Sequence, residues 1–231
     1  MRLGGFVKTT LAEWEGHDCC RLDVRGCNLR CPFCRAPQLI SPEGPETDPA
    51  EAIAYIKSRG DTLDGIAVSG GEPLASPDLY KFLRELKKCR RPIMLETNGT
   101  FPDALDDLVG AELVSYVALS IFAPLDRESY RKATGSGADP ALVRRSIGIL
   151  RDYKVPCDFR VTAVPGLIDG TAVEQIAKEV RDTGTLIIRQ FDPRTCLDPA
   201  WQKAVPYDRA AAAALSAAAK KYARRVKVRG F

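Results

Sequence analysis

Segments typical of β-strands alternate with segments typical of helices along almost the whole chain of 231 residues. Strands are expected where apolar and β-branched residues run together, and helices where a capping residue precedes an amphipathic stretch. The expected strands cover residues 19–24, 64–69, 92–97, 113–122, 157–164 and 185–191. The expected helices cover residues 48–60, 76–89, 102–111, 139–154, 170–184 and 208–226. An order in which each strand is followed by a helix predicts an α/β fold with a parallel sheet.

The expected elements follow one another without a break that would separate domains. No linker rich in Pro, Gly or Ser divides the chain, and no repeat of fixed period is present. We therefore expect one domain over residues 1–231, and a second helix with Ser76 as N-cap and Pro77 at its first position. Alternation alone leaves open whether the sheet is doubly wound or curls into an incomplete barrel.

The charge and hydropathy of the chain restrict its partners. The formal net charge of +4 comes from 34 basic and 30 acidic residues spread along the chain, so a nucleic acid is not indicated as a partner. No apolar run approaches the roughly 20 residues of a membrane span, and residues 1–10 lack the apolar core of a secretion signal. We therefore expect a cytoplasmic protein with no membrane partner.

The chain has eight cysteines, and the cytoplasm is expected to keep them reduced. Three of them, Cys27, Cys31 and Cys34, fall within eight positions directly after the first expected strand. The other five are scattered, as free cysteines used for small apolar packing are: Cys19, Cys20, Cys89, Cys157 and Cys196.

Three clustered thiols are compatible with several kinds of site. Structural zinc needs a fourth ligand, and the only histidine, His17, lies upstream of the first strand. A thioredoxin-like pair would use CPFC, residues 31–34, and would leave Cys27 without a role. A four-iron cluster usually takes four thiolates, so three leave one iron open for a substrate or cofactor.

Three further loops carry unusual residues directly after expected strands. They are SGGEP at 69–73, ETNGT at 96–100 and RQFDP at 189–193. In parallel α/β folds, ligands bind in the loops that leave the carboxyl ends of the strands. We therefore expect these loops and the cysteine loop to build one ligand site.

The sequence CNLRCPFC resembles the CxxxCxxC signature of the radical S-adenosylmethionine enzymes. GGFVKTTLAEWEGHDC, SGGEPLASPDL, LETNGT, FRVTAVPGLID, RQFDPRTCLDP and VKVRG together resemble the activating proteins of anaerobic ribonucleotide reductase, relatives of pyruvate formate-lyase activating enzyme. The resemblance implies a parallel (β/α)6 partial barrel, an incomplete version of the TIM barrel, with the helix and strand of about 207–231 packed on it. It also implies that Cys27, Cys31 and Cys34 are catalytic ligands of a [4Fe–4S] cluster, with S-adenosylmethionine on the open iron.

The same resemblance assigns residues to the binding of S-adenosylmethionine. Phe33 would lie near the adenine, and the loop from Gly70 to Pro73 would meet the methionyl ammonium. The glycines let backbone approach a ligand. The full set is Phe33, Gly70, Gly71, Glu72, Pro73, Thr97, Asn98, Ser120, Arg160 and Gln190.

For some of these residues a purely structural reading stays open. Phe33 could be a packing aromatic. Asn98, which precedes a glycine, could form a turn. Arg160 is expected to pair with the methionine carboxylate, and a salt bridge to a neighbouring acid is the alternative. Gln190 is expected to border the adenine pocket together with Phe191.

One stretch departs from the pattern of the activating proteins. They carry an Asp-x-Lys pair at the end of the fourth strand, where this chain has Ser120 and Phe122. In relatives the aspartate helps to hold a monovalent cation, for which Ser120 offers only a neutral oxygen. Either the cation is absent, or Glu96 and backbone carbonyls hold it.

The resemblance implies reductive cleavage of S-adenosylmethionine to a 5′-deoxyadenosyl radical, with electrons from a flavodoxin or ferredoxin in anaerobic metabolism. The expected substrate is a glycine Cα of a glycyl-radical enzyme, such as anaerobic ribonucleotide reductase. The alternative is a small metabolite or nucleotide, as in deazapurine biosynthesis, which the change at Ser120 and Phe122 keeps open. A thiol redox or zinc-binding module is the third hypothesis.

Overall fold

The computed structural model describes residues 1–231, which form two compact units. The first unit comprises Met1–Asn28, Gln38–Thr97 and Asp103–Val117. The second comprises Leu29–Pro37, Asn98–Pro102 and Ala118–Phe231. Strand β5, Tyr116–Ser120, contributes residues to both units.

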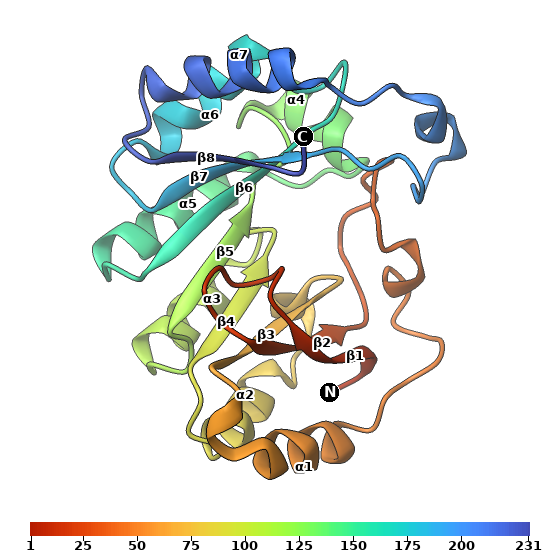
Figure 1. Ribbon diagram of the computed structural model, residues 1–231, viewed down its shortest axis with the longest axis vertical. Helices are drawn as coiled ribbons and strands as arrows, with labels where there is room; N and C mark the ends of the chain where they lie inside the picture. The colour runs from red at the N-terminus through yellow and green to blue at the C-terminus, as the bar shows by residue number, and fades with distance from the viewer. The chain divides into compact units, whose positions relative to one another are not determined.

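The first unit is built on four neighbouring strands, drawn in red to yellow in Figure 1. Strand β1 pairs with β2 in antiparallel fashion, whereas β2 with β3 and β3 with β4 are parallel. These strands are β1 Leu3–Thr10, β2 Cys19–Val24, β3 Gly65–Gly70 and β4 Ile93–Thr97. The helices are α1 Pro49–Arg59, α2 Leu79–Lys87 and α3 Pro102–Gly110, with the short 3-10 turns η1 Pro37–Leu39, η2 Gly60–Thr62 and η3 Pro73–Ala75.

The register of the parallel strands explains the core of the first unit. Leu22 of β2 pairs with Val68 of β3, which pairs with Leu95 of β4. All three side chains are fully buried. Since side chains alternate between the two faces of a strand, these residues form an apolar row on one face of the sheet, and Asp23 and Ser69 lie on the other.

The second unit contains the parallel strands β6 Cys157–Ala163, β7 Thr185–Gln190 and β8 Val226–Arg229. Its helices are α4 Arg127–Thr134, α5 Pro140–Asp152, α6 Gly170–Val180 and α7 Arg209–Lys220, and Pro199–Lys203 forms the 3-10 turn η4. Figure 1 shows α6 and α7 side by side, with α7 along β7 and β8. An aspartate side chain caps the first turn of each helix: Asp126, Asp139, Asp169 and Asp208.

The structure confirms each expected strand, although β5 is shorter than residues 113–122. Two elements were not expected, the edge strand β1 and the helix α4. The expectation for Ser76 is wrong. Its N–H donates to Pro73 O at 3.0 Å to close turn η3, and α2 begins at Leu79 with Asp78 before it. Helix α7 ends at Lys220 rather than 226 because the chain turns into β8.

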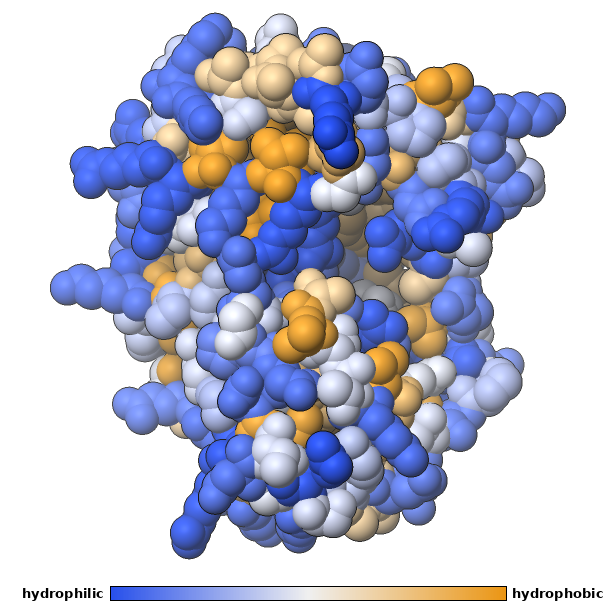
Figure 2. All heavy atoms as spheres, viewed as in Figure 1, coloured by the Kyte–Doolittle hydropathy of each residue, from blue (hydrophilic) through white to orange (hydrophobic).

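None of the helices combines the length and apolar character that a membrane crossing requires. On the face shown in Figure 2, hydrophilic residues predominate and hydrophobic ones form small separate groups. Scattered surface groups of this size are normal for folded proteins. The expectation of a single domain stays a prediction.

Arg25 holds together the loop that follows the cysteines in the first unit. Its side chain is buried, and its Nε donates to Pro45 O at 2.8 Å. Its Nη1 lies within hydrogen-bonding distance of three more carbonyls, those of Gln38, Ser41 and Glu43. One guanidinium therefore satisfies several backbone acceptors that lack partners in a helix or sheet.

Replacing Arg25 should lower the free energy of unfolding much more than replacing an exposed arginine does. For Arg25→Met we expect a loss of about 2–4 kcal/mol in the free energy of unfolding, since buried carbonyls lose their donors. Urea unfolding of the full chain measures this. The matched control is Arg181→Met, an exposed arginine with a weak ion pair to Asp182, for which we expect less than about 0.5 kcal/mol. Equal effects of the two substitutions would contradict the role of Arg25.

Candidate active site

The first cysteine of the loop is held by its backbone. Gly26 N–H donates to Leu39 O at 2.9 Å, and Cys27 N–H donates to Ile40 O at 3.0 Å. These bonds tie the loop after β2 to the end of η1 and to the residue that follows it. The position of the Cys27 backbone is therefore set by pairing within the first unit.

The SGGEP loop after β3 packs directly on this part of the cysteine loop. Gly71 N–H donates to Val24 O and Glu72 N–H donates to Gly26 O, both at 2.8 Å. A Cβ on Gly71 would lie 2.2 Å from Gly26 O, and one on Gly70 would lie 2.3 Å from Val24 N. Gly70 also has a φ of +115°, which disfavours any other residue. The two glycines are thus required by the contact between backbones, a reason that the sequence analysis did not give.

Glu72 connects the SGGEP loop to the end of β4. It is 1% exposed, and its Oε1 accepts hydrogen bonds from Leu74 N–H at 3.1 Å and from Thr97 Oγ1 at 2.7 Å. Pro73, also buried, opens turn η3. The loop residues Gly70 to Pro73 and Thr97 are therefore brought together with Cys27, and the Glu72 carboxylate supports the loop from within.

A polar row lies at the ends of the first unit's parallel strands. Asp23 of β2 pairs in register with Ser69 of β3, whose Oγ donates to Glu96 Oε2 of β4 at 2.9 Å. Burial raises the pKa of Asp23, while Arg21 opposes this shift. Glu96, considered from sequence as a holder of a cation, thus already accepts a hydrogen bond from Ser69.

In the second unit, Cys31 and Cys34 share one turn. Cys34 N–H donates to Cys31 O at 3.0 Å, so the two thiols start from the same tight turn of chain. Burial raises the pKa of the Cys34 thiol, while the charge of Arg35 lowers it.

The end of α4 supports this turn. Arg30 N–H donates to Thr134 O at 2.8 Å, and a Cβ on Gly135 would lie 2.3 Å from Arg30 O. Gly135 has a φ of +58° and ends the helix in the left-handed conformation. The unexpected helix α4 therefore has a role in placing the cysteines.

Phe33, between the two cysteines, packs against two aromatic rings. Its ring centre lies 6.1 Å from that of Phe122 and 6.2 Å from that of Trp201. Phe122 stands where the activating proteins carry lysine, so the departure seen in the sequence places an aromatic ring beside the cysteine turn. Its neighbour Ser120 is half-buried at the end of β5.

Asn98 forms a turn, the structural alternative that the following glycine suggested. Its Oδ1 accepts hydrogen bonds from Thr100 N–H at 3.0 Å and from Thr100 Oγ1 at 2.6 Å. The next residue, Gly99, has its carbonyl bound by the buried Ser146 hydroxyl at 2.8 Å. These hydrogen bonds hold residues 98–100 of the ETNGT loop in place.

Arg160 forms a buried salt bridge within its own strand. Its Nε donates to Asp158 Oδ1 at 2.8 Å and its Nη2 to Asp158 Oδ2 at 3.3 Å. Both side chains are almost fully buried. Residues two apart in a strand point to the same face, so Asp158 is a partner that alternation alone could have identified.

The side-chain amide of Gln190 forms two hydrogen bonds with backbone groups. Its Nε2 donates to Tyr207 O at 2.5 Å, and its Oε1 accepts from Phe191 N–H at 3.0 Å. It thus ties the end of β7 to the segment before α7. The ligand roles of Gln190, Arg160, Asn98 and Ser120 stay predictions.

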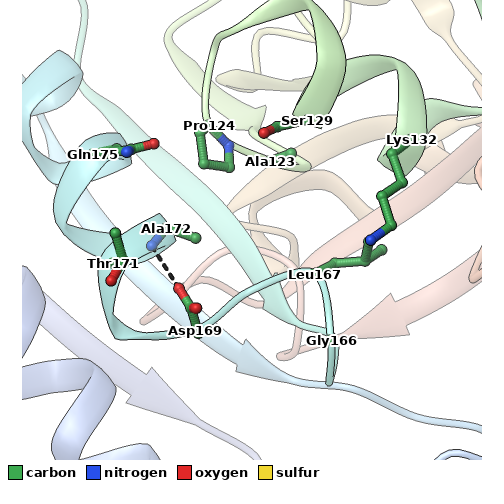
Figure 3. A pocket seen from close by; sticks show the side chains of 10 residues that line it. All are labelled: Ala123, Pro124, Ser129, Lys132, Gly166, Leu167, Asp169, Thr171, Ala172 and Gln175. Carbon is green, nitrogen blue, oxygen red and sulfur yellow. Dashed lines mark hydrogen bonds between the residues drawn. The ribbon is translucent and has the colours of Figure 1, made fainter.

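The second unit also has a cavity of about 270 Å³ (Figure 3). It lies between the loop after β5, helix α4 and the start of α6. Asp169 in its wall accepts a hydrogen bond from Ala172 N–H, as a helix cap. None of the predicted site residues lines it. Its lining is Ala123, Pro124, Ser129, Lys132, Gly166, Leu167, Asp169, Thr171, Ala172 and Gln175.

Comparison with known families gives one match that covers most of the chain. Residues 23–181 match the family model described as the Radical SAM superfamily. This range includes the cysteine loop, the SGGEP and ETNGT loops and Arg160.

Three curated relatives illustrate the matches. A Methanocaldococcus jannaschii protein provisionally named a glycyl-radical enzyme activating enzyme is 29% identical over 206 residues, 87% of this chain and 84% of that protein. The (2S)-3-sulfopropanediol sulfolyase activating enzyme of Bilophila wadsworthia is 31% identical over 52% of this chain and 38% of that enzyme. The 7-carboxy-7-deazaguanine synthase of Methanopyrus kandleri is 30% identical over 38% of this chain and 46% of that enzyme. The chain thus spans less than half of the latter two enzymes.

Solved structures share the fold at low sequence identity. Streptococcus suis SuiB bound to S-adenosylmethionine matches with a TM-score of 0.70 at 14% identity, over 90% of this chain and 49% of SuiB. A radical SAM methyltransferase from Sphaerobacter thermophilus matches with a TM-score of 0.69 at 16% identity, over 94% of this chain and 67% of that one. These likenesses confirm the expected α/β fold of the parallel partial-barrel type.

The close contact of Gly71 can be tested by adding one methyl group. Gly71→Ala places a Cβ against Gly26 O, so we expect a loss of about 2–4 kcal/mol in the free energy of unfolding. Gly148→Ala is the matched control, because it lies inside α5 with no atom within 4 Å of the new Cβ. We expect that control to stabilise the protein by up to about 1 kcal/mol. Unchanged stability of Gly71→Ala in denaturant would contradict the packing account.

Proposed function

This chain belongs to the radical S-adenosylmethionine superfamily, and we propose that it activates a glycyl-radical enzyme, one of the anaerobic ribonucleotide reductase kind. As in that superfamily, its cofactors are a [4Fe–4S] cluster and S-adenosylmethionine. The observation that carries the proposal is the match to the Methanocaldococcus jannaschii protein, because it covers most of both chains. The shorter match to the sulfolyase activating enzyme of Bilophila wadsworthia supports the same substrate class.

The donor set of the chain fits an iron–sulfur cluster. None of Cys27, Cys31 and Cys34 is part of a disulfide, and thiolate is the ligand that iron–sulfur clusters take. When bound, the cluster and S-adenosylmethionine supply a carbon-centred radical that removes a hydrogen atom from the substrate. Cys27, Cys31 and Cys34 would provide three of the sulfur ligands.

The remaining residues of the site hold and shield the cofactors. The packed glycines set the path of the SGGEP loop, whose backbone would face the methionyl end of S-adenosylmethionine. Phe33, whose ring packs against those of Phe122 and Trp201, would offer an aromatic surface for the adenine. Arg160 would meet the methionine carboxylate with its orientation fixed by Asp158.

A second candidate function is supported by the stretch that departs from the activating proteins. Ser120 and Phe122 replace an acid and a base there, which makes the end of β5 more apolar. Part of the chain also matches the deazaguanine synthase of Methanopyrus kandleri. A radical enzyme acting on a small nucleotide-like metabolite is therefore the alternative.

Cleavage of S-adenosylmethionine should depend on each cysteine of the loop. We expect the anaerobically reconstituted and reduced protein to form 5′-deoxyadenosine, measured by chromatography, and Cys31→Ala to lower this to background. Cys89→Ser is the matched control, since Cys89 lies at the end of α2 outside the cysteine loop, and should keep the activity. Background activity of the wild-type protein with a full cluster would count against the superfamily chemistry.

The activase proposal predicts a radical on a partner protein. After incubation with a candidate glycyl-radical enzyme, electron paramagnetic resonance should show a glycyl radical on that partner. A partner with its radical glycine changed to alanine should give no signal. If 5′-deoxyadenosine forms only when a small metabolite is added, and no partner gains a radical, the alternative function replaces the proposal.

A further inference from the structure

A fourth cysteine lies beside the cysteine turn of the second unit. Cys196 belongs to the segment that follows β7, and it is 6% exposed. Its thiol is 3.8 Å from Pro193 O. Neither the proposed cluster nor the proposed binding of S-adenosylmethionine uses this residue.

Two hydrogen bonds set how the Cys196 segment lies along the cysteine turn. Thr195 Oγ1 donates to Arg35 O at 3.2 Å, and Asp198 N–H donates to Pro32 O at 2.9 Å. The residue number rises from 195 to 198 in one segment while it falls from 35 to 32 in the other. The two segments are therefore antiparallel, and the same register places Cys196 opposite Cys34.

Ring packing agrees with this register. The contact between the rings of Phe33 and Trp201 packs the same two stretches together.

The facing register makes Cys196 a candidate partner of the Cys34 sulfur. Residues opposite each other on antiparallel segments lie close enough for their side chains to interact. A disulfide needs about 3.5–4.5 Å between the two Cβ atoms.

We propose that Cys196 is the disulfide partner of Cys34 when the cluster is absent. Two thiols give up two protons and two electrons as the sulfur–sulfur bond forms, and a small disulfide such as oxidised glutathione accepts them and leaves as two thiols. With the cluster in place, the Cys34 sulfur is bound to iron and cannot react. The bond would remove one cluster ligand until a thiol reductant opens it, whatever the substrate of the enzyme is.

Peptide mapping of the full-length protein tests this directly. Cluster-free and cluster-loaded protein are treated with oxidised glutathione without oxygen, alkylated, and digested with trypsin without reduction. Trypsin releases CPFCR, residues 31–35, and TCLDPAWQK, residues 195–203. We expect mass spectrometry to find these peptides joined in the cluster-free sample and separate in the cluster-loaded sample.

Variants identify which sulfur forms the bond. The joined peptides should persist in Cys31→Ser, which leaves Cys34 as the only cysteine of its peptide, and should vanish in Cys34→Ser. Cys157→Ser, which removes another buried thiol of the second unit, is the control and should keep them. The proposal is overturned if the wild-type protein forms only a bond between Cys31 and Cys34 and Cys196 stays alkylated or joined to glutathione in Cys31→Ser.

Discussion

The contact between the backbones of Gly26 and Gly71 is the constraint on which the first half of the site depends. The Gly26 carbonyl lies where a side chain at position 71 would have to be, and it accepts a hydrogen bond from Glu72 N–H. Cys27 is the next residue, so its position follows from this contact. Buried Glu72 then extends the contact to Thr97 at the end of β4. The glycines of the SGGEP loop are thus explained by its packing against the loop after β2.

The second unit secures the other two cysteines by different means. The turn from Cys31 to Cys34 is held at its start by the end of α4, through Thr134. Its far side is bound by the segment that carries Cys196. Cys34, a proposed cluster ligand, and Cys196 therefore lie on facing segments, which is the basis of the disulfide that we propose. The superfamily sets the chemistry, and the substrate class is what the proposed function adds to it.

The sequence predicted the elements that follow a strong periodic pattern. The apolar strands and capped helices were found to within a few residues, and the three motif cysteines were recognised by their spacing. Strand β1 was missed because an edge strand with two glycines and exposed polar residues has no clear alternation. Ser76 was misassigned because a Ser-Pro pair is compatible both with the N-cap of a helix and with the end of a 3-10 turn, and here it ends turn η3. The hydrogen bond of Arg25 to the carbonyl of Pro45 joins residues that are far apart in the sequence. A pattern of neighbouring residues cannot predict such a contact.

The central claim is that three thiols hold a cluster and leave one iron for S-adenosylmethionine. The most direct measurement is the electron paramagnetic resonance spectrum of the reduced, cluster-loaded protein before and after S-adenosylmethionine is added. An open iron predicts a clear change in the spectrum, since the ligand binds the cluster itself. A spectrum that stays the same at saturating S-adenosylmethionine, in protein with a full complement of iron and sulfide, would contradict the account.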